Sequence, residues 1–249
     1  MGRPLCDRLA QSGDGMVLAA RGRAALEAQA GELKAAGAAG PIHVLPVDMG
    51  DLQSVAEFGS ALAALDVTLD GAVLMPPQMP RTNDPLPDAE VWTTLFQGSF
   101  IGPLALLKHA IAAMRPDPGA GRRAKIVIVS GISSAQVLGH YATANVLRTA
   151  WLGQAKTLAL ALGASGIHVN TVSFGGTLTA HYAGLVEARA AANGVTLDQQ
   201  IAAETENVPL RKYCTPQEAA LTVDTLLSAF SDHMTGINLL QDGGFTRAY

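Results

Sequence analysis

Six short apolar runs alternate with longer helical stretches, and this alternation constrains the fold more than any other feature of the chain. Each run is short and rich in branched aliphatic residues, as in a strand buried on both faces. The runs are GMVLAA, PIHVLPV, DGAVLM, KIVIVS, IHVNTVS and INLLQ. Helical periodicity covers residues 2–12, 22–37, 51–64, 88–115, 139–163 and 216–230. The pattern predicts an α/β fold with a doubly wound parallel sheet.

No internal repeat or low-complexity linker divides the chain, so we expect one domain over residues 1–249. The net charge is −4, with 17 basic and 21 acidic residues and no basic run, which predicts neither a nucleic-acid partner nor a membrane partner. The chain has two cysteines, no leader, and no apolar run of the roughly 18 residues that a spanning helix needs. We therefore expect a cytoplasmic protein.

Two long helical stretches carry very little charge. Residues 139–163 contain only Arg148 and Lys156, and no charge lies between Glu90 and Lys108. Helices that are apolar nearly all round are buried on both sides, which predicts contact with another subunit. The alternative is that an alanine-rich composition lowers the charged fraction, 15% here against about 25% in an average soluble domain, without meaning for assembly.

Two segments near the end carry a family resemblance. IHVNTVS is followed by FGG, and TGINLLQDGG comes later; LPVDMGD and WTTLFQGSFIGPLALLKHAIAAM add to the pattern. In this order they resemble the short-chain dehydrogenase/reductase family. The resemblance implies a Rossmann-like doubly wound sheet, a nicotinamide cofactor, and catalysis by serine, tyrosine, lysine and asparagine. It also implies that the two weakly charged helices form a subunit interface.

The family's catalytic positions are all changed when its spacings are laid on this chain. Spacing from the fifth strand and spacing back from the glycine of GIHVN both place the tyrosine at Ala144. The serine position is Gly131, the lysine position is Arg148, and the asparagine position is Ser99. Arg148 is then a charge without a tyrosine beside it. The resemblance therefore predicts no catalytic residue.

Tyr141 stands three residues before Ala144, in the stretch GHYATANVLRTA, with Asn145 where a Tyr-x-x-x-Lys motif would have its lysine. A shift of three residues is about 4.5 Å along a helix, more than the roughly 3 Å reach of proton transfer. An alignment that keeps Tyr141 catalytic needs a three-residue insertion inside the helix, which rotates its apolar face away from the sheet. We expect Tyr141 to be an ordinary contact on the helix or at an interface.

The cofactor positions are also changed. The chain begins MGRPLCDRLA, with Gly2 matching the last glycine of the family's phosphate-binding turn, so we expect the usual first strand to be lacking. Leu74, Met75, Pro76 and Pro77 replace Asn-Asn-Ala-Gly, and Phe174 replaces the proline beside the nicotinamide. The resemblance thus predicts no bound cofactor and no cofactor-binding residue. Asp48 matches an adenine-contacting aspartate but is also expected simply to cap the next helix.

No metal site is predicted, because the histidines show no ligand spacing and the cysteines are far apart. The first hypothesis is a catalytically inactive, cofactor-free subunit in a heterotetramer with an active NAD-dependent paralogue, similar to the cofactor-free subunit of a short-chain dehydrogenase that acts on an acyl-CoA substrate in anaerobic toluene degradation. The second is a cofactor-independent lyase or isomerase that uses His140, Tyr141 and Tyr182. The third is an ordinary NAD(P)-dependent reductase.

Overall fold

The computed structural model describes residues 1–247, and it has the layered α/β architecture that the alternating pattern predicts. All of its strand pairs are parallel. The strands are β1 (Met16–Leu18), β2 (Ile42–Val44), β3 (Gly71–Leu74), β4 (Ala124–Gly131), β5 (Ile167–Phe174) and β6 (Asn238–Gln241). Each coincides with a predicted run, β4 and β5 extending one residue beyond theirs at one or both ends, and the predicted Rossmann-like fold class is confirmed.

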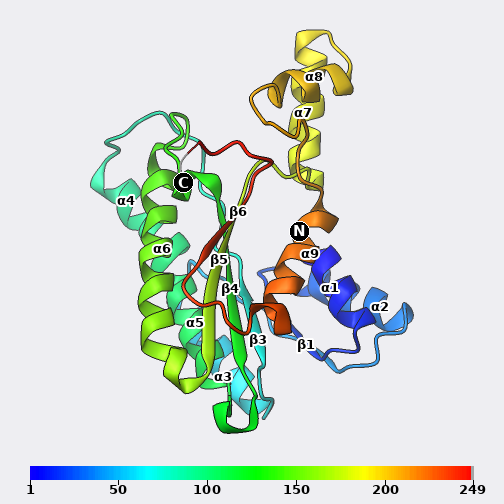
Figure 1. Ribbon diagram of the computed structural model, residues 1–249, viewed down its shortest axis with the longest axis vertical. Helices are drawn as coiled ribbons and strands as arrows, with labels where there is room; N and C mark the ends of the chain where they lie inside the picture. The colour runs from blue at the N-terminus through cyan, green and yellow to red at the C-terminus, as the bar shows by residue number, and fades with distance from the viewer. Residues whose placement is uncertain (248–249) are drawn as a thin grey trace.

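The helices cover both faces of the sheets. They are α1 (Gly2–Gln11), α2 (Arg23–Ala35), α3 (Leu52–Ala64), α4 (Ala89–Phe96), α5 (Gly102–Ala112), α6 (Ala142–Leu162), α7 (Ala180–Asn193), α8 (Leu197–Glu204) and α9 (Pro216–Leu227). Figure 1 shows α3, α5 and α6 on one face and α1 and α9 on the other. A π-helical turn at Gln97–Ile101 joins α4 to α5 within the predicted stretch 88–115.

The strands form two sheets, with order β1-β2 in one and β3-β4-β5-β6 in the other. From β1 the chain proceeds outward to β2, and from β3 it proceeds outward the opposite way. Among residues 1–247 no strand pairs with the inner edges of β1 and β3. The division is a topological switch point, where open α/β sheets bind ligands at the carboxyl ends of their strands.

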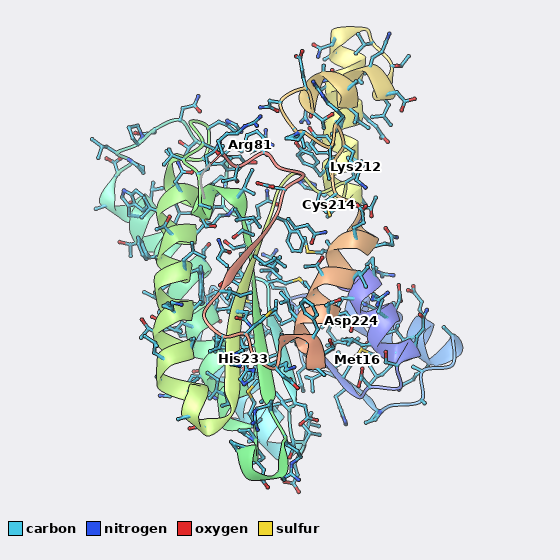
Figure 2. The ribbon with its side chains drawn as sticks, viewed as in Figure 1. Met16, Arg81, Lys212, Cys214, Asp224 and His233 are labelled. Atoms are coloured by element: carbon cyan, nitrogen blue, oxygen red, sulfur yellow. The ribbon has the colours of Figure 1, made fainter. Side chains whose placement is uncertain are left out.

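Helix α1 attaches the two-stranded sheet to the rest of the molecule. Leu5 on α1 is buried against Val223 and Leu226 of α9. The Arg8 guanidinium donates from Nε and Nη2 to one carboxylate oxygen of Asp224 at 2.9 and 2.7 Å. Figure 2 shows Asp224 on α9 facing α1, with Met16 of β1 nearby. This bidentate contact spans 216 residues of sequence and ties the two parts together.

Helices α7 and α8 follow Thr179, between β5 and α9. Figure 1 shows them projecting beyond the sheet, on the side of the carboxyl end of β5. Thr179 caps α7 by accepting a hydrogen bond from Tyr182 N at 3.3 Å, and Thr196 and Gln199 form a capping box at α8. We call residues 180–204 the lid. Over residues 1–247 no helix combines the length and the apolar character needed to cross a bilayer.

Replacing Arg8 by Met tests the attachment, because Met keeps much of the side-chain volume and removes the charge. We expect the free energy of unfolding to fall by about 1 kcal/mol, since a partly buried Asp224 loses a charged hydrogen-bond partner. The measurement is urea unfolding followed by tryptophan fluorescence. Arg23→Met is the matched control, because Arg23 pairs with Glu27 on an exposed surface at 3.5 Å. Equal stability of the two variants would contradict this role of Arg8.

Candidate functional site

Tyr141 is the N-cap residue of α6 and not a residue inside the helix. Its φ and ψ are −129° and 38°, so its side chain does not point in the direction that the side chain of a helical residue would take. Asn145 fixes the approach to this position: its side-chain amide donates to Leu138 O at 3.0 Å and accepts from Leu138 N at 3.2 Å. Asn145 therefore does not stand in for a lysine; it holds the turn that leads into Tyr141.

The loop of residues 76–87, which is rich in proline, pairs with the chain on both sides of Tyr141. Thr82 N donates to His140 O at 3.2 Å, and Thr82 O accepts from Ala142 N at 3.0 Å. This pairing places Arg81 beside Tyr141, where Arg81 Nε donates to the phenol oxygen at 3.0 Å. The guanidinium carbon is 5.3 Å from the ring centroid. Figure 2 shows Arg81 at the edge of the sheet where β4 ends.

Arg148 reaches the same ring from within α6. Its guanidinium carbon is 5.6 Å from the Tyr141 centroid, and Nη1 donates to Ser133 Oγ at 3.0 Å. A Cβ at Gly131 would lie 2.6 Å from Arg148 Nη1, so the glycine at the end of β4 leaves room for the guanidinium. Desolvation lowers the pKa of Arg148, an effect that Tyr141 partly offsets.

The expectation that Arg148 has no tyrosine beside it is therefore wrong. That expectation treated Tyr141 as part of a regular helix, one turn away from the site. The N-cap conformation of Tyr141 breaks this assumption, because it places the ring against the guanidinium of a residue seven positions later. One phenol and two guanidinium groups meet at the carboxyl end of β4.

The other two family positions belong to the core. Ala144 is fully buried and packs with Met79 and Leu147. Ser99 is buried in the π-helical turn, where its backbone oxygen accepts a hydrogen bond from Trp151 Nε1 at 2.9 Å. Sequence spacing located these positions, but neither brings a titratable group to the site.

The lid is held together by a charged cluster. Arg189 donates from Nε and Nη2 to the two carboxylate oxygens of Glu204 at 2.6 and 2.8 Å, and Tyr213 Oη donates to Glu204 at 2.5 Å. The Arg189 hydrogen bond is the main reason that the pKa of Glu204 falls to about 2. Tyr182 packs edge-on against Tyr213, with 5.5 Å between ring centroids.

The residues of the lyase hypothesis come together in part. The ring centroids of His140 and Tyr141 lie 4.6 Å apart, and Tyr182 of the lid raises the pKa of Arg81. Arg81 is thus the shared neighbour of two tyrosines. Sequence reasoning did not single out Arg81; its place between two prolines in the loop gave no functional signal.

The structure shows where the residues at the family's cofactor-contacting positions lie in this chain. Leu74 is buried in the core, and Phe174 is buried on the α9 side of the sheet instead of facing the site. Asp48 accepts a hydrogen bond from Gly50 N at 2.8 Å, within a turn. The cap of α3 is Asp51, which accepts from Gln53 N at 2.9 Å, so the alternative role given to Asp48 is wrong.

Three features fit a dinucleotide cofactor at the switch point. β1 and β3 belong to separate sheets, and the strand order proceeds away from each in opposite directions, as at the switch point of a dinucleotide-binding sheet. Arg21, just beyond β1, is exposed and forms no ion pair within residues 1–247. Ser130 Oγ, near the end of β4, is buried without a hydrogen-bond partner among the described residues. Pro76 and Pro77 supply no backbone donors, so the fit rests on these other groups.

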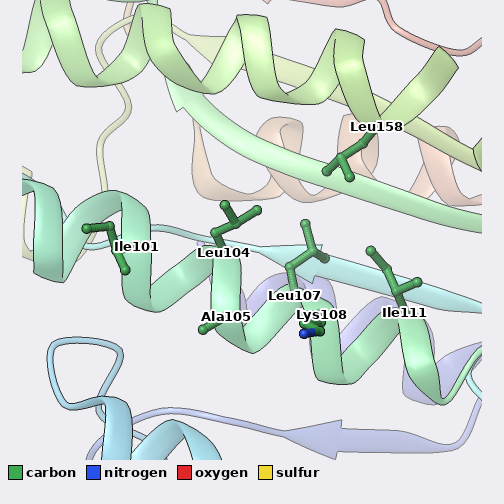
Figure 3. A pocket seen from close by; sticks show the side chains of 7 residues that line it. All are labelled: Ile101, Leu104, Ala105, Leu107, Lys108, Ile111 and Leu158. Atoms are coloured by element: carbon green, nitrogen blue, oxygen red, sulfur yellow. The ribbon is translucent and has the colours of Figure 1, made fainter. Parts of the chain in front are cut away.

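An apolar groove of about 420 Å³ lies away from this site, between α5 and α6. Figure 3 shows its lining, which is aliphatic apart from Lys108. The lining residues are Ile101, Leu104, Ala105, Leu107, Lys108, Ile111 and Leu158. This face coincides with the stretch predicted to contact another subunit. That contact stays a prediction, as do the single domain and the absence of a metal site.

The comparisons with known proteins cover the whole chain. The sequence model of the family described as Enoyl-(Acyl carrier protein) reductase matches residues 1–246. The chain belongs to the short-chain dehydrogenase/reductase family. The Bacillus subtilis protein YvaG, described as an uncharacterized oxidoreductase, is 23% identical over 252 residues, spanning 100% of this chain and 92% of its own length.

Solved structures of two proteins show the same fold. A short-chain oxidoreductase of Pseudomonas aeruginosa with an atypical catalytic center has a TM-score of 0.88 and 21% identity in its apo form, covering 100% of this chain and 94% of its own. Its NADPH-bound form has a TM-score of 0.83, 22% identity and coverages of 100% and 93%. L-sorbose reductase from Gluconobacter frateurii, complexed with NADPH and L-sorbose, has a TM-score of 0.89, 21% identity and coverages of 100% and 93%.

These comparisons contradict the hypothesis of a catalytically inactive, cofactor-free subunit. The Pseudomonas aeruginosa protein and L-sorbose reductase, which share this fold over the full chain, are described as an oxidoreductase and a reductase, and each has a structure that holds NADPH. The narrower resemblance to a subunit of toluene degradation gains no support from them. The error has a physical source: only the positions counted along the sequence were considered, whereas Tyr141 and Arg81 make a polar contact outside that spacing.

The lid cluster predicts a loss of order in acid. The pKa of Glu204 is about 2 in the folded protein against an ordinary value of 4.5, so its ionised form stabilises the lid above pH 4.5 and this contribution is lost as the pH falls toward 2. We expect amide hydrogen exchange in α7, corrected for intrinsic rates, to accelerate from pH 5 to pH 3. Glu204→Gln should exchange rapidly already at pH 5. Glu187→Gln, which changes an exposed carboxylate on α7, should exchange as the wild type does. If the corrected exchange rates of α7 in the wild type do not change between pH 5 and pH 3, this role of Glu204 is contradicted.

Proposed function

We propose that this chain is an NADP(H)-dependent oxidoreductase that reduces a carbonyl compound, with Tyr141 as its proton donor. The observation that carries the proposal is the contact between Tyr141 Oη and Arg81 Nε at 3.0 Å, with the Arg148 guanidinium on the same ring. Family membership and the NADPH in structurally similar oxidoreductases support it.

The hydrogen-bonding chemistry leaves the tyrosine proton available. Arginine has donors only, so Tyr141 Oη accepts from Arg81 and its own O–H is free to point toward a substrate oxygen. When that proton leaves, two guanidinium charges stabilise the phenolate that forms. Arg81 and Arg148 together would supply the positive charge that a lysine supplies elsewhere in the family. The nicotinamide cofactor, when bound, supplies the hydride.

Arg21, Ser130 and Arg148 are the residues that we propose hold the cofactor. An acidic residue near the end of the second Rossmann strand selects NAD, whereas an arginine nearby accommodates the 2′-phosphate of NADP. β1 is followed by Arg21, with no acidic residue between Leu18 and Arg23. We also propose that the usual first strand of the family is lacking. This is supported by the edges of β1 and β3 that pair with no other strand within residues 1–247.

The partner prediction also continues as a proposal: α5 and α6 pack against another short-chain dehydrogenase chain. The apolar groove between them and the exposure of Leu160 support it, because an uncovered apolar surface of this kind favours association.

Tyr141→Phe tests the proton donor directly. The variant keeps the ring and its contacts with both guanidinium groups but removes the hydroxyl, so we expect kcat for NADPH-dependent carbonyl reduction to fall about a hundredfold or more. The assay follows NADPH absorbance across a panel of carbonyl substrates. NADPH binding by the variant should equal that of the wild type, which shows that the loss is chemical. A variant that keeps more than about a tenth of the wild-type kcat would rule out Tyr141 as the donor.

Arg21→Ala tests the cofactor preference. Loss of a guanidinium that pairs with a 2′-phosphate should weaken NADPH binding about tenfold or more and leave NADH binding nearly unchanged. Fluorescence titration of each nucleotide measures the ratio. Arg122→Ala is the control, because Arg122 pairs with Asp117 at 3.3 Å before β4, at the opposite edge of the sheet. An equal effect on both nucleotides would exclude phosphate recognition by Arg21.

A further inference from the structure

The charge around Tyr141 is unbalanced. Arg81 and Arg148 both lie within 6 Å of its ring, and neither forms an ion pair with any carboxylate of residues 1–247. Among the carboxylates of the lid, Glu204 is already bound on both oxygens by Arg189. The site therefore carries two uncompensated positive charges, an arrangement that favours binding of an anion.

The guanidinium groups of Arg81 and Arg148 differ in how freely they can bind an anion. Arg148 is partly buried beneath Gly131 and donates to Ser133, which keeps it at the end of β4. Arg81 is exposed, and it donates from Nε to Tyr141 Oη at 3.0 Å. Its Nη1 and Nη2 groups, which bind planar carboxylates in a fork, form no ion pair within residues 1–247, and Tyr182 is their neighbour.

We infer that Arg81 binds the carboxylate of the substrate and that the substrate is a short oxo acid. The inference rests on the proposed function and narrows its substrate class. Because Arg81 donates from Nε to Tyr141 Oη at 3.0 Å, a carboxylate held by the same guanidinium lies next to the proton donor. The carbonyl that receives the proton must then be about one or two carbons from the carboxylate, given hydrogen bonds of about 2.9 Å.

Tyr182 links this recognition to the lid. It lies beside Arg81, extends from the first turn of α7, and packs against Tyr213. Desolvation opposes the charge on Arg81, but Tyr141 and Tyr182 together hold the pKa of Arg81 above its ordinary value. The arginine stays charged at every working pH, so carboxylate binding should not depend on its titration.

The reaction balances with the components of the proposed function. The carbonyl carbon accepts hydride from NADPH, its oxygen accepts the Tyr141 proton, and the C=O double bond becomes a C–OH single bond. The products are the hydroxy acid and NADP⁺, and Tyr141 takes up a proton from solvent. The carboxylate is unchanged, because Arg81 only positions it.

The test compares pyruvate and acetoacetate with their methyl esters, which keep the carbonyl and remove the charge. Binding to the wild-type protein, without and with NADPH, is followed by saturation-transfer NMR, and reduction is followed by NADPH absorbance. We expect the acids to bind at least tenfold more tightly than the esters. Arg81→Gln should abolish that difference, Arg81→Lys should restore part of it, and Arg122→Gln should leave it unchanged.

The possible outcomes separate this inference from the proposed function. Equal binding of acids and esters by the wild type would overturn the carboxylate site, even if both are reduced. Tight binding of the acids without reduction of any carbonyl compound would support the Arg81 site and contradict the proposed reductase. Inorganic phosphate that competes as strongly as pyruvate would also overturn the inference, because it would show a site for anions in general.

Discussion

The two main-chain hydrogen bonds of Thr82 determine the geometry of the candidate site. They join a proline-rich loop to the residues before and after Tyr141, so the backbone beside Arg81 cannot move away without breaking both. The same bonds hold α6 at its first turn, where no side chain caps the helix. A phenol at a helix N-cap is thereby held between a guanidinium from a loop and a guanidinium from the second turn of the helix.

This arrangement lies at the edge of the sheet where an α/β fold brings loops together. Gly131 ends β4 without a side chain, which gives Arg148 its space. The lid follows β5 and brings Tyr182 to the same edge. β1 and β3 are not paired with each other, and Arg21 follows β1. Groups that are far apart in sequence therefore converge, because parallel strands all end on one side.

Much of the fold could be predicted because strands and helices are signalled by local periodicity. KIVIVS and IHVNTVS are short runs in which valine and isoleucine recur, and they form the two central strands of the larger sheet. The site could not be predicted in the same way. Spacing assumes that each position keeps the family's local conformation, and Tyr141 departs from that assumption at the helix N-cap. Arg81 lies in a loop whose path depends on pairing with residues about sixty positions later, which no local pattern records.

The account depends most on whether this chain binds a nicotinamide cofactor. Isothermal titration of the purified protein with NADPH measures this without knowledge of the substrate. The account predicts one binding site per chain with a dissociation constant in the micromolar range, or roughly −8 kcal/mol. No heat of binding at millimolar NADPH, from protein shown to be folded by circular dichroism, would contradict it.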